Sequence, residues 1–357
     1  MADRRLGSSW LGIWTRAVVV PAARKAAPVW IGSVMVGTTI FGPTAMEPRD
    51  LTQIALEVPV FGAVLAVTWL LLFLPTAQIL VRQDAAMYLR SLPAGRWWPV
   101  VLAVGSLVAL QLPWLALWVV GERVLGAALV GVVTLVIVAL AAIRPRRRRL
   151  RATRWRGDRA ALRGIYLRAL TRRAGDAIVR GTGLAILAGL TAGLFARNNQ
   201  LDASGSAVLA TGVIVVMLVP GWAGLLLPLV EAHRSTGWLA ATLGVTERGR
   251  LAVLATTIAI LYALTSLVAA VAACFVLQGS LATTAAVAGL AVAISPALAL
   301  VATRALVWAE KQPTHTPARV VTGVVVTSAL AVIALGWLGG LGAAALAVVG
   351  IFAVGTG

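Results

Sequence analysis

The chain has 357 residues, of which 60% are hydrophobic and only 12% are charged, and its mean hydropathy is +0.93. A soluble domain carries about a quarter charged residues, whereas residues 251–303 here contain no charged side chain. These values exclude a water-soluble globular fold. They predict an all-α polytopic membrane protein, because a helix of about 20 apolar residues satisfies its own backbone inside a bilayer.

The segments before the first and fifth predicted spans are expected to form amphipathic helices that lie in the membrane interface. Each combines apolar side chains at helical spacing with arginines elsewhere on the helix, which is the pattern of interfacial helices. The second of these segments begins at Asp158, which is placed as its N-cap. The predicted interfacial anchors are Trp10, Trp14, Arg16, Tyr166 and Arg168.

Apolar stretches bounded by charged residues, proline or glycine predict the membrane spans. The last two predicted spans are short, and the sequence LGWLGGLG between them is expected to form a turn. The ten predicted spans are 28–43, 57–81, 99–120, 124–143, 178–196, 206–230, 251–277, 281–306, 320–336 and 341–356.

The basic residues set the predicted orientation. Of the 31 Lys and Arg residues, all but Arg49, Arg123 and Arg197 fall on one side of the predicted spans. The positive-inside rule then predicts cytoplasmic N and C termini in a bacterial inner membrane. The arginine-rich stretch 144–173 lies on that side, where anionic lipid headgroups are its expected partners. No nucleic-acid recognition module accompanies it, so no nucleic-acid partner is expected.

A repeated motif predicts an internal duplication. GIWTRAV (Gly12–Val18) and GIYLRAL (Gly164–Leu170) recur at an offset of 152 residues. Both precede a predicted four-span unit, and an even number of spans gives parallel repeats of the same orientation. The predicted domains are a first repeat at 1–143, a basic cytoplasmic linker at 144–157, a second repeat at 158–307, and a cytoplasmic loop with a two-span hairpin at 308–357.

The chain lacks the residues that several chemistries need. Neither Lys25 nor Lys311 follows a glycine, so no P-loop for ATP is present. His233 and His315 are far apart, and no zinc-protease motif contains them. The predicted spans carry no ionisable residue near their centres, which disfavours an ion-coupled carrier. We therefore expect no catalytic residue, cofactor or metal site in this chain. We also expect that the chain is not an enzyme by itself.

Two predicted cytoplasmic loops have similar layouts. They are VRQDAAMYLRSLPAGRWWPVV (81–101) and EAHRSTGWLAATLGVTERGRLAV (231–253), and each follows the second span of its repeat. Each loop is predicted to contain one short helix, at Asp84–Leu92 in the first and at Ser235–Leu243 in the second. The first residue of each helix is predicted to be its N-cap. Pro93 and Gly244 are expected to end these helices.

These loops and the amphipathic segments resemble the permease subunits of ABC exporters of the drug, peptide and polysaccharide class. In that family a short cytoplasmic helix between the second and third spans docks into a separate ATPase subunit. The resemblance implies that ATP and Mg bind in that partner, expected in two copies, which contacts loops 82–98 and 231–250. The implied docking residues are Asp84, Tyr88, Leu89, Arg90, Leu92, Pro93, Ser235, Trp238, Leu239, Leu243, Gly244 and Glu247.

The layout departs from that family in its number of spans. The family's usual subunit has six spans and dimerises, whereas two four-span halves share this chain. One chain would then supply both docking loops, or the whole would form a homodimer. The uncharged path between the repeats favours an apolar or amphipathic substrate. An ion-coupled secondary transporter with two parallel repeats and a non-transporting membrane scaffold remain the alternative functions.

Overall fold

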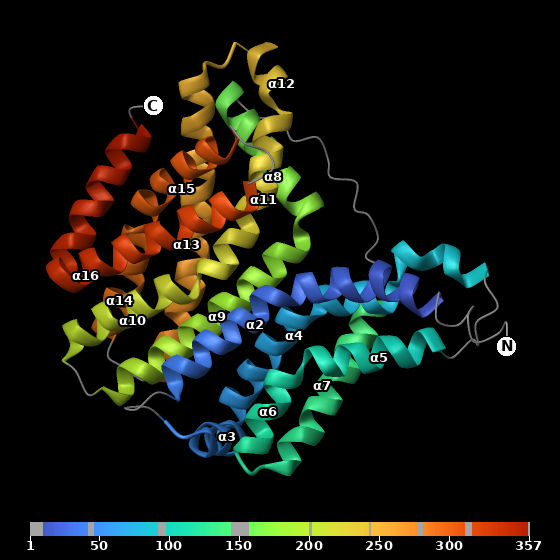
Figure 1. The fold of residues 1–357 in the computed structure, drawn as a ribbon. Helices are drawn as coiled ribbons and strands as arrows, with labels where there is room; N and C mark the ends of the chain where they lie inside the picture. Colours follow the sequence, from blue (N-terminus) through green and yellow to red (C-terminus); the bar gives the residue numbers. More distant parts are fainter. Residues whose placement is uncertain are drawn as a thin grey trace. The chain divides into compact units, whose positions relative to one another are not determined.

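Most of the described polypeptide is helical. The computed structural model describes residues 10–41, 46–91, 98–143, 157–199, 202–242, 244–277, 281–310 and 316–355. Within these ranges the chain forms helices and contains no strand (Figure 1). The predicted all-α class is therefore confirmed.

The described part contains five helices that are long and apolar enough to cross a bilayer, or seven spans if each of two bent helix pairs counts as one. A multi-pass helical membrane protein follows from this, but ten spans are not confirmed. The predicted first span falls in α2 (Val20–Ile40), which is not among the candidates. The predicted fourth falls in α7, whose apolar part is short. The five candidates are Pro59–Arg82, Gly175–Asn198, Glu247–Leu277, Ala282–Trp308 and Pro317–Trp337.

The chain divides into two compact units. The first comprises Met1–Val34 and Phe41–Arg148, and the second comprises Met35–Ile40 and Arg149–Gly357. The division at Arg148 falls within the predicted basic linker, most of which, at 144–156, lies outside the described residues. The first unit contains most of α2 together with η1 (Thr15–Val19), α3 (Pro48–Glu57), α4 (Pro59–Arg82), η2 (Asp84–Ser91), α5 (Trp98–Leu110), α6 (Leu112–Val120) and α7 (Val124–Ala142).

The second unit holds the remaining helices. In its C-terminal helix the backbone leaves the helical region at Gly339, where φ is 52° and ψ is −136°. This break lies within LGWLGGLG, where the sequence predicts a turn. The helices of this unit are α8 (Asp158–Arg173), α9 (Gly175–Asn198), α10 (Ala203–Met217), α11 (Val219–Ser235), α12 (Gly237–Thr242), α13 (Glu247–Leu277), α14 (Leu281–Ala293), α15 (Ser295–Glu310) and α16 (Thr316–Gly355).

A buried polar network marks the bend between α5 and α6 in the first unit. The bend is 55° and follows from Pro113, which cannot donate the backbone hydrogen bond that would continue α5. Trp69 of α4 donates its indole N–H to Gln111 Oε1 at 2.7 Å, and Gln111 Nε2 donates to Thr134 Oγ1 of α7 at 3.1 Å. Trp69 also stacks on Trp114 of α6, with ring centroids 4.4 Å apart. These contacts fix α4, α6 and α7 around the bend.

The second unit has a comparable contact. Trp222 of α11 stacks on Tyr262 of α13 with centroids 4.3 Å apart, and its indole N–H donates to Thr265 Oγ1 at 2.9 Å. Trp222 lies six residues before Pro228, as Trp69 lies six residues before Pro75. In each unit, therefore, a tryptophan upstream of a helix-internal proline binds an aromatic ring and a polar side chain of a later helix.

The closest helix packing in the second unit joins α9 to α13. Gly189 and Gly193 lie one turn apart on α9 and face the α13 backbone. A methyl group at Gly189 would collide with the carbonyl oxygen of Ala269, and one at Gly193 would lie 2.6 Å from that of Ala273. Small residues at this spacing allow the two helix backbones to approach closely within a bilayer. α9 and α13 therefore form a closely packed pair.

Candidate functional site

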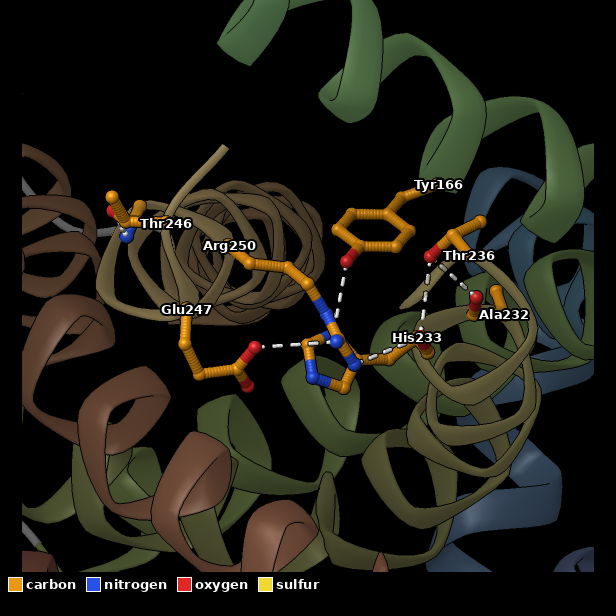
Figure 2. Close-up of polar contacts among 8 residues, drawn as sticks. Tyr166, Ala232, His233, Thr236, Thr246, Glu247 and Arg250 are labelled. Atoms are coloured by element: carbon orange, nitrogen blue, oxygen red, sulfur yellow. Dashed lines mark hydrogen bonds and ion pairs between the residues drawn. The ribbon is translucent and has the colours of Figure 1, made fainter. Parts of the chain in front are cut away.

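The predicted docking loop of the second unit starts from a buried polar cluster that we call the second junction. Its members are Tyr166 of α8, His233 and Thr236 at the end of α11, and Glu247 and Arg250 in the first turn of α13 (Figure 2). The distant helix α8 therefore meets the end of α11 and the start of α13, which flank one loop.

The position of Tyr166 follows from the apolar face of α8. Leu162, Tyr166 and Leu170 recur every four residues, so they lie on one face of the helix, and all three are buried. Burial raises the pKa of Tyr166, against the opposing influence of Thr236 and Arg250. The phenol therefore keeps its proton at neutral pH and can donate a hydrogen bond.

The hydrogen-bond directions at His233 follow from Arg250, which can only donate. Arg250 Nε lies 3.4 Å from His233 Nδ1, and Arg250 Nη2 donates to the His233 carbonyl oxygen at 3.1 Å. Nδ1 is therefore an acceptor, and the Tyr166 hydroxyl donates to it at 2.8 Å (Figure 2). The imidazole thus accepts from α8 and from α13 at the same atom.

Two further residues complete the second junction. Thr236 Oγ1 lies 2.9 Å from the carbonyl oxygen of Ala232 and 3.2 Å from that of His233, so it satisfies the end of α11. Glu247 forms an ion pair with Arg250 at 3.3 Å. Glu247 is largely exposed, so this pair contributes little to stability. Its effect is to orient Arg250 toward the end of α11.

The first unit has a smaller cluster in the corresponding place, which we call the first junction. Trp14 is buried and donates its indole N–H to Gln83 Oε1 at 3.4 Å. Gln83 follows the last residue of α4 in the left-handed region, with φ at 49°. Its Nε2 donates to the carbonyl oxygen of Pro99 in α5 at 3.1 Å. The segment before α2, the end of α4 and the start of α5 are joined in this way.

The two junctions use matching positions of the repeated motif. Trp14 and Tyr166 are the aromatic residues of GIWTRAV and GIYLRAL, 152 residues apart. Each binds a side chain at the end of the helix that leads into the predicted docking loop. Sequence reasoning singled out both aromatic residues but missed their partners Gln83 and His233. Gln83 and His233 differ in residue type. What they share is a side chain that can accept a hydrogen bond at the end of an apolar helix, and this is the only sequence signal that could have identified them.

The predicted loop helices are present with different bounds. The first is the 3₁₀-helix η2 at Asp84–Ser91, where Asp84 is the first residue of the helix rather than its N-cap. The second is α12, which begins at Gly237. Ser235 is the last residue of α11, so its prediction as an N-cap is wrong. Its hydroxyl lies 3.1 Å from the carbonyl oxygen of Ala232 in the preceding turn.

Exposed aromatic residues occupy both loop helices. Tyr88 is 59% exposed and Trp238 is 70% exposed, whereas Leu239 is only partly exposed. Gly244 follows α12 in the left-handed region with φ at 68°, a conformation that glycine adopts without strain. Leu92, Pro93 and Leu243, with the side chains of Leu89 and Arg90, lie outside the described part of the chain.

The predicted interfacial anchors occupy different environments. Trp14 and Tyr166 are buried within their own units, Trp10 and Arg168 are partly buried, and Arg16 is exposed. Their anchoring role stays a prediction. In the second unit Gly157 occupies the N-cap position of α8, and Asp158, predicted as the N-cap, is its first residue.

The residues described contain no group of three His, Cys, Asp or Glu side chains that could hold a metal ion. Comparison with family models, with curated proteins and with solved structures finds no match for this chain.

Proposed function

We propose that this chain is the membrane-spanning permease subunit of an ATP-driven exporter of the ABC class. Loops 82–98 and 231–250 would dock into a separate cytosolic ATPase, present in two copies. The observation that carries the proposal is that each loop starts at a helix end hydrogen-bonded to the amphipathic segment before its unit, through Trp14–Gln83 and Tyr166–His233.

The junctions give such a loop a mechanical connection to the spans. The second loop is held at both ends, because His233 near its start and Arg250 at its end are hydrogen-bonded to each other. A push on α12 would therefore displace the ends of α11 and α13 together with α8. Rigid-body motion of packed helices is an established form of conformational coupling, and the close α9–α13 contact would pass the motion to a further span.

The exposed aromatic residues support a protein partner at the loops. Tyr88 and Trp238 begin the similar sequences YLRSL and WLAATL, lie in the two loop helices and are more than half exposed. Aromatic side chains contribute most of the binding energy in many protein interfaces. Two matched loops in one chain suit a partner with two-fold symmetry. We assign the docking contacts to Tyr88 and Trp238 in preference to the less exposed Leu239.

The charge pattern supports a proposed orientation and a class of cargo. The basic loops would face the cytosol of a bacterial inner membrane, with both termini inside. The repeated motif and the two tryptophan–proline pairs support an origin of the two units by duplication. The apolar interior favours an apolar or amphipathic substrate, for which the partner ATPase supplies the energy.

The proposal is tested by purifying the chain from its native host in mild detergent and measuring the co-purified ATPase and its ATP hydrolysis. Tyr88→Ala with Trp238→Ala should lose both, while the protein stays folded. Trp337→Ala is the matched control, because Trp337 is 87% exposed and would lie on the opposite membrane face. Recovery of no ATP-hydrolysing partner with the wild-type chain would overturn the proposal and favour the ion-coupled transporter or the scaffold.

A further inference from the structure

Two arginines of α8 lie against the first turns of α13. Arg163 Nη2 is 3.4 Å from Thr256 Oγ1, and its Nε is buried without a hydrogen-bond partner among the described residues. Arg159 lies one turn earlier, with its Nε 3.8 Å from the position that a side-chain carbon at Gly249 would take. Residues four apart share a helix face, so the two guanidinium groups point to the same side of α8.

No described carboxylate neutralises this pair. The nearest acidic residue in the first turn of α13 is Glu247, and its carboxylate pairs with Arg250 at 3.3 Å. Arg159 and Arg163 form no ion pair with a described residue. A buried guanidinium nitrogen without an acceptor is costly. The positive charges of Arg159 and Arg163 and the unpartnered Nε donor of Arg163 therefore favour a bound anion.

The length of α13 places this pair at the level of lipid headgroups. The helix has 31 residues and is about 46 Å long at 1.5 Å per residue. The hydrocarbon core of a bilayer is only about 30 Å thick, so about 16 Å of the helix extends beyond it. The charged residues of α13 lie in its first turn, and every residue from Leu251 onward is uncharged. The extending part is therefore the N-terminal one, and Thr256 lies near the boundary.

We propose that Arg159 and Arg163 bind the phosphate group of an anionic phospholipid. A guanidinium group presents paired N–H donors that match phosphate oxygens, and the Nε donor of Arg163 has no partner among the described residues. The bound headgroup would hold α8 against α13 beside the second junction. This inference depends on the placement of α13 in a bilayer and is independent of any ATPase partner.

The test compares Arg163→Gln with Arg172→Gln in purified full-length protein. Both residues belong to α8, and nine residues of helix place them on opposite faces. Binding of phosphatidylglycerol is measured by native mass spectrometry and by thermal unfolding in mild detergent, with phosphatidylcholine and inorganic phosphate as comparison ligands. We expect phosphatidylglycerol alone to stabilise the wild type. Its affinity should fall at least about tenfold in Arg163→Gln and stay unchanged in Arg172→Gln.

Two further variants make the result decisive. Arg159→Gln changes an exposed side chain, so it reports on the site even if Arg163→Gln does not fold. Arg163→Lys keeps the charge but loses the paired donors, and it should bind the lipid more weakly than the wild type. Equal losses in Arg163→Gln and Arg172→Gln would show diffuse charge attraction and overturn the proposal. Equal stabilisation by inorganic phosphate would overturn the assignment to a lipid.

Discussion

Tyr166 and His233 are 67 residues apart in the sequence, and a hydrogen bond of 2.8 Å joins their side chains. In the other unit, Trp14 donates a hydrogen bond to the side chain of Gln83, which is 69 residues away in the sequence. In both cases the bond connects the segment before the unit to the helix end at which a loop begins. Displacement of either loop would therefore be transmitted directly to that segment.

The hydroxyl of Tyr166 is expected to contribute measurably to stability. Tyr166→Phe keeps the buried ring but removes the donor to His233 Nδ1. We predict a loss of about 1 kcal/mol, the usual net value of one buried hydrogen bond. Denaturant unfolding in mild detergent measures it. A Tyr166→Phe variant as stable as the wild type would contradict this account of the junction.

The first junction is expected to show energetic coupling between its two residues. Trp14→Phe removes the indole donor, and Gln83→Asn shortens the acceptor while keeping a residue type that tolerates a left-handed backbone. A double-mutant cycle on unfolding free energies should give an interaction of about 0.5–1 kcal/mol. Strictly additive losses would mean that the two side chains do not interact.

The close α9–α13 packing predicts opposite effects for two glycine substitutions. Gly189→Ala places a methyl group against the Ala269 carbonyl oxygen and should destabilise the protein by about 1–3 kcal/mol. Gly212→Ala in α10 places its methyl group in open space and should be neutral or stabilising by up to about 1 kcal/mol. Thermal unfolding of the two variants measures the difference. Similar melting temperatures would show that the helices can separate without cost.

The stability that the N-terminal cap of α10 contributes is expected to depend on pH. Asp202 caps this helix by accepting from Gly205 N at 2.9 Å and from Ser204 Oγ at 2.6 Å. These hydrogen bonds, that of Ser204 first, lower the pKa of Asp202. The contribution of this cap to stability is therefore fully present above the ordinary aspartate pKa of about 4. It is lost as the pH falls through the lower pKa of Asp202 in the folded protein.

The measurement for this cap is thermal unfolding of Asp202→Ala and of the wild type across pH. The variant should be less stable at pH 7, and the two proteins should converge as the carboxylate of the wild type is protonated. A difference that stays constant into acid would show that the carboxylate charge plays no part in the cap.

The fold class could be predicted from composition, but the helix breaks could not. In a uniformly apolar stretch, a straight span and two helices that meet at a bend have the same hydropathy. The bends before Pro113 and Pro220 therefore fall inside predicted single spans. The end of α11 at Ser235 is a related case. His233 is polar and its residue type favours a loop, yet it belongs to the helix, where its Nδ1 contacts Tyr166 and Arg250.

The candidate site could be predicted only in part. The aromatic residues at Trp14 and Tyr166 recur in a recognisable motif, so sequence comparison within the chain finds them. Their partners have no shared residue type, because glutamine and histidine can each accept the hydrogen bond. Exposure separates Trp238 from Leu239 in the second loop helix, and that difference depends on how α12 lies on its unit rather than on sequence.

Site-specific crosslinking to an ATPase tests the proposed docking most directly. The chain has a single cysteine, Cys274, so Cys274→Ser provides a background for Tyr88→Cys, Trp238→Cys and Trp337→Cys. Each variant is labelled with a photoactivatable crosslinker in native membranes and purified. The proposal predicts that one ATPase is captured from both loop positions and not from position 337. Capture of no ATPase from either loop, or equal capture from all three positions, would contradict it.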